Sequence, residues 1–248
     1  MPDASRVAAN ILLVLAYILG CTSLGLFGLF LWLGPFPVAN LNLTTPLIMW
    51  FDALLAITFF LQHSVMLRRP FRARLARLLP EYYQPVLYAI LSAVVLFLLP
   101  LFWQLGPDLL TLRGPLRWLV RGAFFASMAG MVWGFGSLRH FDPLGAGPVL
   151  AHLRSQPAPA THLIIRGAYR WVRHPIYSSF LLMIWASPDV TADRLLFNVL
   201  WSVWMAIGTR LEERDLAADF GEAYRKYQRS VPMLLPRSFR PRAQGEPA

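Results

Sequence analysis

The sequence predicts an all-α, polytopic membrane protein with four transmembrane helices, a C-terminal helical hairpin and a cytoplasmic C-terminal helix. Composition is the first observation behind this prediction. Of the 248 residues, 56% are hydrophobic and only 15% are charged, whereas roughly 25% of the residues in an average soluble domain are charged. The second observation is a series of apolar runs of about 20 residues, enough to cross a hydrocarbon core roughly 30 Å thick.

Four apolar runs are long enough to span a membrane, at residues 7–33, 47–67, 85–105 and 116–138. The first run is longer than the apolar core of a signal peptide, so we expect a retained helix there. Asp52, Gln62 and His63 lie in or at the ends of the second run. Polar residues in membrane spans are functional candidates, and His63 is expected either at the interface or at a substrate gate.

A pair of shorter apolar runs follows, at residues 175–186 and 195–207, with a polar turn at 187–189 between them. Each run alone makes a helix of roughly 18–20 Å, which is short for a full crossing. Together they predict a hairpin whose two outer ends lie on the same side of the membrane. Its second leg is expected to continue as a helix past Thr209 into water.

The distribution of arginine predicts the orientation. The segments after the second run, after the fourth run and after the hairpin are rich in arginine, whereas the first loop has none. The positive-inside rule therefore places these segments and both termini in the cytoplasm, as in a multi-pass protein of the inner (plasma) membrane. The same distribution accounts for the net charge of +10, and the chain offers no soluble basic domain for nucleic acid.

Two domains are expected: a four-helix transmembrane region at residues 1–138, and a region at 139–248 that carries the chemistry. A linker-like stretch at 156–160 lies between them. The single cysteine, Cys21, provides neither a disulfide nor a thiolate metal site. No metal is expected, because His63, His140 and His174 lack a characteristic ligand spacing.

Two polar blocks flank the hairpin, and its fold brings them to one end. The sequence YRWVRHPIY at 169–177 precedes it, and RLEERD at 210–215 follows it. With Pro175 in the first helical turn, Arg173 and His174 lie at the positive end of a helix, which suits a carboxylate. A glutamate pair can bind an ammonium group or ribose hydroxyls. The plainer alternatives are interface anchors for the first block and a solvated helix face for the second.

The order and spacing of these residues resemble the signature of the isoprenylcysteine carboxyl methyltransferase superfamily, which are membrane-integral enzymes. The matching patterns are RHP-x-Y at 173–177, EE at 212–213 and F-G-x-x-Y-x-x-Y-x-x-x-V-P-x-x-L-P at 220–236, preceded by L-I-x-x-G-x-Y at 163–169. Upstream, LQHSVM at 61–66 and HFD at 140–142 resemble the bacterial branch that contains methanethiol S-methyltransferases and NnrU-type proteins.

The resemblance implies S-adenosylmethionine as the cofactor and residues 139–248 as the methyltransferase core. The residues implied to line the cofactor pocket are Leu163, Ile164, Tyr169, His174, Pro175, Ile176 and Tyr177. Glu212 is implied to hold the polar part of the cofactor. Arg173, Arg210 and Glu213 are the candidate catalytic groups, since a nearby arginine favours a thiolate. Of these, Arg210 is the nearest counterpart of a family arginine that contacts substrate, but its offset from the glutamates differs.

We therefore expect an S-adenosylmethionine-dependent membrane methyltransferase that acts on a small or lipophilic acceptor, with S-methylation of a thiol favoured. Membrane lipids are the expected surroundings. One alternative acceptor is a prenylated carboxylate or a phospholipid amine. A different class of alternative is a non-catalytic accessory protein of the NnrU type. A short GAG sequence at 145–147 is similar to a GxG element of phospholipid N-methyltransferases, which alone is weak support.

Overall fold

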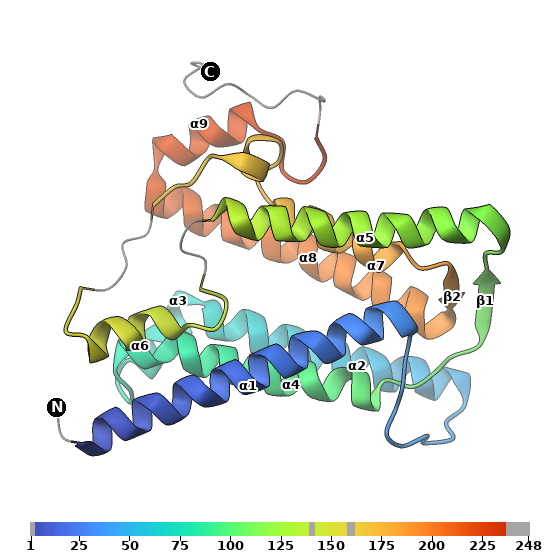
Figure 1. Cartoon of the computed structure of the whole chain (residues 1–248), viewed down its shortest axis with the longest axis horizontal. Helices are drawn as coiled ribbons and strands as arrows, with labels where there is room; N and C mark the ends of the chain where they lie inside the picture. Colours follow the sequence, from blue (N-terminus) through green and yellow to red (C-terminus); the bar gives the residue numbers. More distant parts are fainter. Residues whose placement is uncertain (1–2, 139–141, 158–161, 237–248) are drawn as a thin grey trace. The chain divides into compact units, whose positions relative to one another are not determined.

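The computed structural model describes residues 3–138, 142–157 and 162–236, and these are largely helical (Figure 1). The helices are α1 (Asp3–Leu33), α2 (Thr45–Leu67), α3 (Arg69–Leu75), α4 (Gln84–Phe102), α5 (Gly114–Ser137), α6 (Ala146–Leu153), α7 (Pro175–Trp185), α8 (Ala192–Phe220) and α9 (Glu222–Ser230), with 3₁₀ turns η1 (Glu81–Tyr83) and η2 (Gly167–Arg170). Four segments are long and apolar enough to cross a membrane: Arg6–Leu33, Thr45–Leu67, Glu81–Phe102 and Gly114–Ser137. The predicted all-α polytopic fold is confirmed.

The predicted hairpin is made of α7 and α8. Pro175 is the first residue of α7, where a missing N–H costs no helical hydrogen bond. The second leg continues past Thr209, because α8 is one helix of 29 residues. α9 follows after Gly221, whose φ of +57° breaks the helical path.

Two short strands, β1 (Asp108–Thr111) and β2 (Asp189–Thr191), pair in antiparallel fashion. The sequence does not predict these strands. Strands of four and three residues are too short to show the alternating pattern by which a strand is recognised. The pairing ties the turn of the hairpin to the segment that leads into α5.

The chain forms two compact units that alternate along the sequence. Of the described residues, the first unit contains 3–107, 142–157 and 192–197, and the second contains 108–138, 162–191 and 198–236. The fourth membrane-length helix, α5, thus belongs to the same unit as α7 and the part of α8 from Asn198 onward. The predicted functional boundary between residues 138 and 139 stays a prediction.

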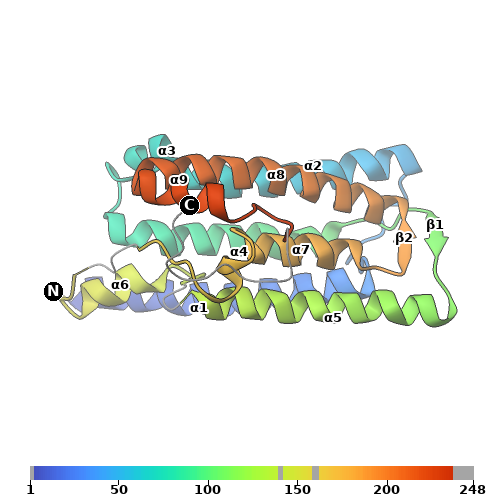
Figure 2. The same ribbon diagram turned by 90° about the horizontal axis from the view of Figure 1, so that it is seen from above.

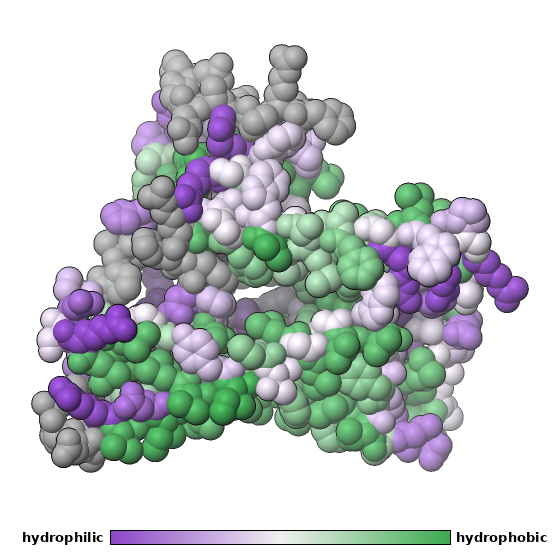
Figure 3. All heavy atoms as spheres, viewed as in Figure 1, coloured by the Kyte–Doolittle hydropathy of each residue, from purple (hydrophilic) through white to green (hydrophobic). Residues whose placement is uncertain are grey.

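In the first unit, α1 packs along α4, and α6 lies on both. Ala9, Leu13 and Ala16 of α1 are buried in this packing. Val7 and Ile11 of the same helix are 56% and 54% exposed. Hydrophobic side chains run along α1 on the face shown in Figure 3. A helix that is apolar on its exposed side as well as its buried side is typical of a lipid environment.

Buried polar groups join the start of α8 to the end of α4 in the same unit. Asp193 accepts hydrogen bonds from Trp103 Nε1 at 3.2 Å and from the Gly106 N–H at 2.8 Å. Asp52 is fully buried, and its Oδ1 accepts the N–H of Gln104 at 3.0 Å. The described contacts of Asp52 are thus with the segment that ends α4.

The side chain of His63, on α2, has a hydrogen-bond partner on α4. Its Nε2 lies 2.7 Å from the hydroxyl of Tyr88. Gln62 donates from Nε2 to the Ser92 hydroxyl at 3.2 Å. These bonds lie between two membrane-length helices, and both the interface and the gate interpretations of His63 stay predictions.

The GAG sequence at 145–147 begins α6. Asp142 accepts the N–H groups of Ala146 and Gly147, at 3.0 and 2.6 Å. Gly145 has a φ of +66°, and a Cβ there would lie 2.3 Å from the Pro85 carbonyl carbon. These N–H groups are therefore used by the chain itself, and Gly145 lets α6 dock on α4.

Gly145→Ala should destabilise the first unit, because alanine tolerates neither the left-handed φ nor the contact with the Pro85 backbone. We expect the free energy of unfolding in detergent to fall by about 2 kcal/mol. The control is Gly136→Ala in α5, where no atom lies within 4 Å of the added Cβ. Alanine favours a helix by about 1 kcal/mol over glycine, so this variant should be as stable as wild type or more so. Equal thermal unfolding of the two variants would contradict the role of Gly145.

In the second unit, α5 and α7 lie side by side (Figures 1 and 2). Two glycines of α5 make this approach possible. A Cβ at Gly130 would lie 2.7 Å from Ser179 Oγ, and a Cβ at Gly134 would lie 2.9 Å from Ile176 Cγ1. Small residues commonly allow membrane helices to pack this closely. The close packing holds the C-terminal half of α5 against the beginning of α7.

Candidate active site

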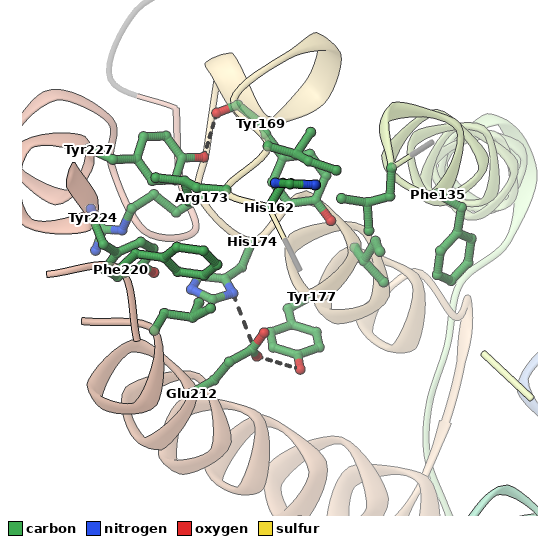
Figure 4. A pocket seen from close by; sticks show the side chains of 15 residues that line it. Phe135, His162, Tyr169, Arg173, His174, Tyr177, Glu212, Phe220, Tyr224 and Tyr227 are labelled. Carbon is green, nitrogen blue, oxygen red and sulfur yellow. Dashed lines mark hydrogen bonds and ion pairs between the residues drawn. The ribbon is translucent and has the colours of Figure 1, made fainter. Parts of the chain in front are cut away.

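A cavity of about 300 Å³ lies in the second unit, at the end of the hairpin where α7 begins. Its walls come from the end of α5, the segment before α7, the first turn of α7, the end of α8, and α9. Figure 4 shows that side chains from these separate segments converge on one space. One wall is aromatic, with Phe220, Tyr224 and Tyr227, and Glu212 lies beside Tyr177.

The first turn of α7 is held by the segment that follows α9. The N–H groups of Arg173 and His174 donate to the carbonyls of Pro232 and Met233, at 2.8 and 3.1 Å. Ser178 Oγ donates to the carbonyl of Leu234 at 2.6 Å. The expectation that the backbone at this helix end receives a carboxylate is therefore wrong for these two N–H groups, because the C-terminal segment occupies them.

Arg173 makes an ion pair that anchors the site. Its Nε lies 2.6 Å from Glu213 Oε1, and the two side chains are only 10% and 12% exposed. Its Nη1 donates to the carbonyls of Gln228 and Val231. Burial alone raises the pKa of Glu213, but the hydrogen bond and charge of Arg173 outweigh it and hold the pKa below 4.5. Glu213 is thus ionised at neutral pH.

His174 lies between the two glutamates of α8. Its Nε2 is 3.2 Å from Glu213 Oε1, and its Nδ1 is 3.9 Å from Glu212 Oε2. Its ring stacks on Tyr177, with centroids 5.4 Å apart and planes 3° from parallel. Burial lowers the pKa of His174 below 6.5, although both carboxylates oppose this shift. The imidazole is therefore neutral at pH 7.

Glu212 is the carboxylate that faces water. Its side chain is 43% exposed, against 12% for Glu213. The hydroxyl of Tyr177 donates to Glu212 Oε2 at 2.7 Å, as Figure 4 shows. A carboxylate held in one orientation beside a cavity can bind cationic or hydroxyl groups of a ligand.

Three tyrosines surround the other side of the cavity. Tyr227 donates its hydroxyl to the carbonyl of Tyr169 at 2.6 Å, which joins α9 to η2. Burial raises the pKa of Tyr169, Tyr224 and Tyr227, so all three are neutral. The Tyr224 hydroxyl is buried without a hydrogen bond of normal geometry to the described residues, although Arg173 lies close enough to act on its pKa.

Most of the residues predicted from sequence lie at this cavity. Leu163, Ile164, Tyr169, Arg173, His174, Ile176, Tyr177 and Glu212 all line it. Glu213 lies behind His174 and Arg173 rather than on the wall. Pro175 is buried at the start of α7 and shapes the turn. Arg210 is exposed on α8, and its guanidinium bonds the Ala206 carbonyl of the same helix at 3.3 Å.

Sequence reasoning missed several lining residues. Phe135 of α5 and Leu138 directly after it lie in an apolar sequence that carries no local signal for a site. Leu216, Phe220 and the tyrosines of α9 also line the cavity. Tyr224 and Tyr227 are three residues apart, a spacing that places two side chains on one face of a helix. His162 completes this group. His140, which belongs to the HFD sequence, lies outside the described residues.

Comparison with curated proteins finds relatives over most of the chain. It is 36% identical over 194 residues to methanethiol S-methyltransferase 2 of Bradyrhizobium diazoefficiens, covering 76% of this chain and 73% of that protein. It is 36% identical over 199 residues to the methanethiol S-methyltransferase of Pseudomonas deceptionensis, covering 77% and 74%. A more distant relative is Nurim of Rattus norvegicus, 26% identical over 192 residues and 71% of each chain. No family model and no solved structure matches.

The membrane-length helices, the cavity at the end of the hairpin and these relatives together define an integral-membrane methyltransferase. The prediction of an enzyme of this class is confirmed. The chain belongs to the methanethiol S-methyltransferase family. The similarity to Nurim agrees with the wider superfamily that the sequence resembles.

Arg173→Gln should destabilise the protein and change its response to acid. Because the folded-state pKa of Glu213 lies below the unfolded value of 4.5, this carboxylate contributes stability above pH 4.5 that is lost as pH falls through the folded pKa. Without Arg173, a buried charge is left at pH 7, and the free energy of unfolding should fall by on the order of 3 kcal/mol. Thermal unfolding in detergent from pH 7 to 3.5 should show the two proteins converging in acid.

The matched control is Arg229→Gln, which also breaks an arginine–glutamate pair. Its partner is Glu222, and the two side chains are 59% and 68% exposed. Exposed pairs contribute little, so this variant should unfold like wild type at every pH. Parallel unfolding curves for Arg173→Gln and wild type across the range would contradict the stabilising role of the buried pair.

Proposed function

We propose that this protein transfers the methyl group of S-adenosylmethionine to a small thiol, such as methanethiol, at the cytoplasmic face of the inner membrane. The observation that carries the proposal is the cavity between the two ends of the hairpin, where an oriented carboxylate, an aromatic wall and apolar side chains meet. Membership of a family named for methanethiol S-methylation supports the acceptor.

The residues present suit such a cofactor. Glu212 offers a partly exposed carboxylate to the ammonium group or ribose hydroxyls, and Tyr177 holds it in place. The hydroxyl of Tyr224 is buried on the cavity wall, where a polar group of the ligand can complete its hydrogen bonding. Phe220 and the other aromatic rings of the wall favour a flat heterocycle and a sulfonium cation.

When bound, the cofactor supplies a methyl group on a positively charged sulfur, open to in-line attack. The chain contributes position and surroundings rather than a covalent intermediate. Glu212 and the aromatic wall fix the donor, and the apolar residues of α5 and α7 exclude water from the acceptor side. Exclusion of water strengthens each electrostatic contact in the cavity.

The apolar end of the cavity favours a small acceptor. Phe135 and Leu138 of α5 and Ile176 of α7 line it, and Gly134 keeps the two helices in close contact there. A volume of about 300 Å³ lies at the lower limit of ordinary ligand pockets. Donor and acceptor must both be accommodated here, which favours a small acceptor over a bulky lipid.

The arginine distribution supports an orientation with both termini and the cavity in the cytoplasm. Arg166, Arg170 and Arg173 all precede α7 at the end where the cavity lies. Cofactor then arrives from the cytosol, whereas a volatile, lipophilic thiol partitions from the bilayer.

The proposal is tested by a methyl-transfer screen of the purified protein with labelled S-adenosylmethionine. The acceptors are methanethiol and other short thiols, an isoprenylcysteine analogue and phosphatidylethanolamine. Transfer to methanethiol with little transfer to the two lipids is the expected result. If only a lipid is methylated, the acceptor is one of the alternatives and not a thiol. If the protein neither transfers a methyl group nor binds the cofactor, the result favours the non-catalytic accessory role.

Glu212→Ala should abolish binding of S-adenosylhomocysteine, because it removes the carboxylate that holds the polar part of the ligand. Isothermal calorimetry in detergent should show at least a 100-fold rise in Kd, about 2.7 kcal/mol, which is the scale of a lost charge-assisted contact. Glu222→Ala is the control, since its carboxylate is exposed at the start of α9. If the two variants bound S-adenosylhomocysteine with similar affinity, Glu212 would not be part of the binding site.

Phe135→Ala should widen the acceptor range. Removing the ring enlarges the apolar end, so the ratio of kcat/KM for butanethiol to that for methanethiol should rise by about tenfold, a typical value for a few methylenes in an apolar pocket. The control is Phe125→Ala, on the same helix but 55% exposed and not on the cavity wall. An unchanged ratio in Phe135→Ala would show that another wall limits acceptor size.

A further inference from the structure

His174 has more charged neighbours than a residue that only lines a cofactor pocket needs. The ring has a carboxylate opposite each nitrogen, with Nε2 at 3.2 Å from Glu213 Oε1 and Nδ1 at 3.9 Å from Glu212 Oε2. It is 6% exposed and lines the cavity. Nε2 is hydrogen-bonded to Glu213, whereas Nδ1 lies beyond hydrogen-bond distance of Glu212.

The proton on the neutral ring is placed by Glu213. Because this carboxylate is ionised and paired with Arg173, it accepts hydrogen bonds and donates none. Nε2 therefore carries the N–H, which points at Glu213 Oε1. The remaining lone pair is on Nδ1, on the side of Glu212 and Tyr177.

The ring is thus arranged as a base with an orienting carboxylate. An aspartate or glutamate on one ring nitrogen fixes the tautomer and stabilises the imidazolium once the other nitrogen takes a proton. Here a second carboxylate, Glu212, lies beside the nitrogen that receives it. Both carboxylates favour the charged ring, whereas burial and the neighbouring Arg173 oppose it.

We propose that His174 accepts the proton of the acceptor thiol at Nδ1 during methyl transfer, and that Glu213 is the positioning residue that orients it. The proposal rests on the proposed function, since it concerns the same cavity and acceptor. Under this proposal, the two glutamates have different roles. Glu212 holds ligand and faces water, whereas Glu213 stays behind the histidine.

A thiol needs such a base because the thiolate is the nucleophile. A free cysteine thiol has a pKa of about 8.5, so only a few per cent of it is ionised at pH 7. An alkanethiol lacks the electron-withdrawing groups of cysteine and is less acidic still, so almost all of it keeps its proton at pH 7. In the step we propose, the S–H bond breaks and its proton goes to Nδ1. The sulfur electron pair forms the new S–CH₃ bond, and the bond from that methyl to the sulfonium sulfur of the donor breaks, leaving its electrons on that sulfur. The proton then leaves to water past the exposed carboxylate of Glu212.

The other ionisable groups around the ring do not compete for this role. Arg173 is paired with Glu213, and the Tyr177 hydroxyl donates a hydrogen bond to Glu212. From the remaining walls, Tyr169 and Tyr224 face the site, and burial raises the pKa of each, so both stay neutral. His162 also lines the cavity. Of the two lining histidines that the structure describes, His174 is the one with a carboxylate within hydrogen-bond distance of its ring to fix the tautomer.

The test compares two acceptors of the same size. Methanethiol keeps its proton at neutral pH, whereas methaneselenol is far more acidic and is largely ionised there. His174→Gln should lose about 100-fold in kcat on methanethiol at pH 7, the usual scale of general-base catalysis, and should keep most of its rate on methaneselenol. The rate of this variant on methanethiol should rise about tenfold per pH unit as hydroxide ionises the thiol, while the wild-type rate levels off above the pKa of His174.

Glu213→Gln provides a second measurement. It should retain transfer to methaneselenol, lose rate on methanethiol, and shift the pH midpoint of the methanethiol rate downward, because a carboxylate that favours the imidazolium is gone. His152→Gln, a histidine of α6 in the first unit, is the control and should change neither acceptor. Retained selenol transfer and binding of S-adenosylhomocysteine show that each variant is folded.

Equal losses of His174→Gln on both acceptors would overturn the proposal, since they mean a role in binding rather than in proton transfer. A wild-type rate of His174→Gln on methanethiol would overturn it as well. If wild type methylates neither acceptor, the proposed function itself fails and the role of His174 falls with it. These outcomes are distinct, because the first two require an active wild-type enzyme.

Discussion

The guanidinium of Arg173 joins three segments that are far apart in the sequence. It pairs with Glu213 on α8, donates to the carbonyls of Gln228 and Val231 around the end of α9, and precedes the first turn of α7. Taking two charges out of water is costly unless each remaining donor and acceptor finds a partner. Here Gln228 also donates to Glu213, at 3.1 Å. The buried pair therefore offsets the cost of its desolvation only when all three segments are assembled. This requirement couples the folding of the C-terminal segment to the shape of the cavity.

This coupling explains how a short hairpin makes a polar site next to a membrane. The two legs return the chain to one end, where a neutral histidine, the carboxylate of Glu212 and a set of tyrosines surround one space. Each tyrosine presents an apolar ring and a polar hydroxyl, a combination suited to the boundary between lipid and water. Apolar residues of α5 close the opposite side. The methyl donor that we propose is charged and water-soluble, and the proposed acceptor is apolar. A cavity in this position lets the two reach the same space from different surroundings.

Sequence reasoning predicted the fold well because its signals were strong. Long apolar runs, Pro175 at a helix start and the spacing between RHP and EE all have one simple structural meaning. It predicted less about which groups face the cavity. From the sequence alone, Arg173 is predicted to bind an anion. Its hydrogen bonds to the carbonyls of Gln228 and Val231 could not be predicted, because they depend on the tertiary structure. Phe135 carries no signal, because one apolar residue of a membrane helix resembles the next. The adjacent glutamates 212 and 213 look equivalent in sequence, and only burial separates them, at 43% and 12% exposed.

The central claim is that the buried Arg173–Glu213 pair is structural and that Glu212, in front of it, meets the ligand. A crystal structure of the protein with S-adenosylhomocysteine tests this claim most directly. The account predicts ligand density in the cavity, in contact with Glu212 and Tyr177, with Arg173 still paired to Glu213. Density elsewhere, or a ligand carboxylate bound by Arg173 in place of Glu213, would contradict it.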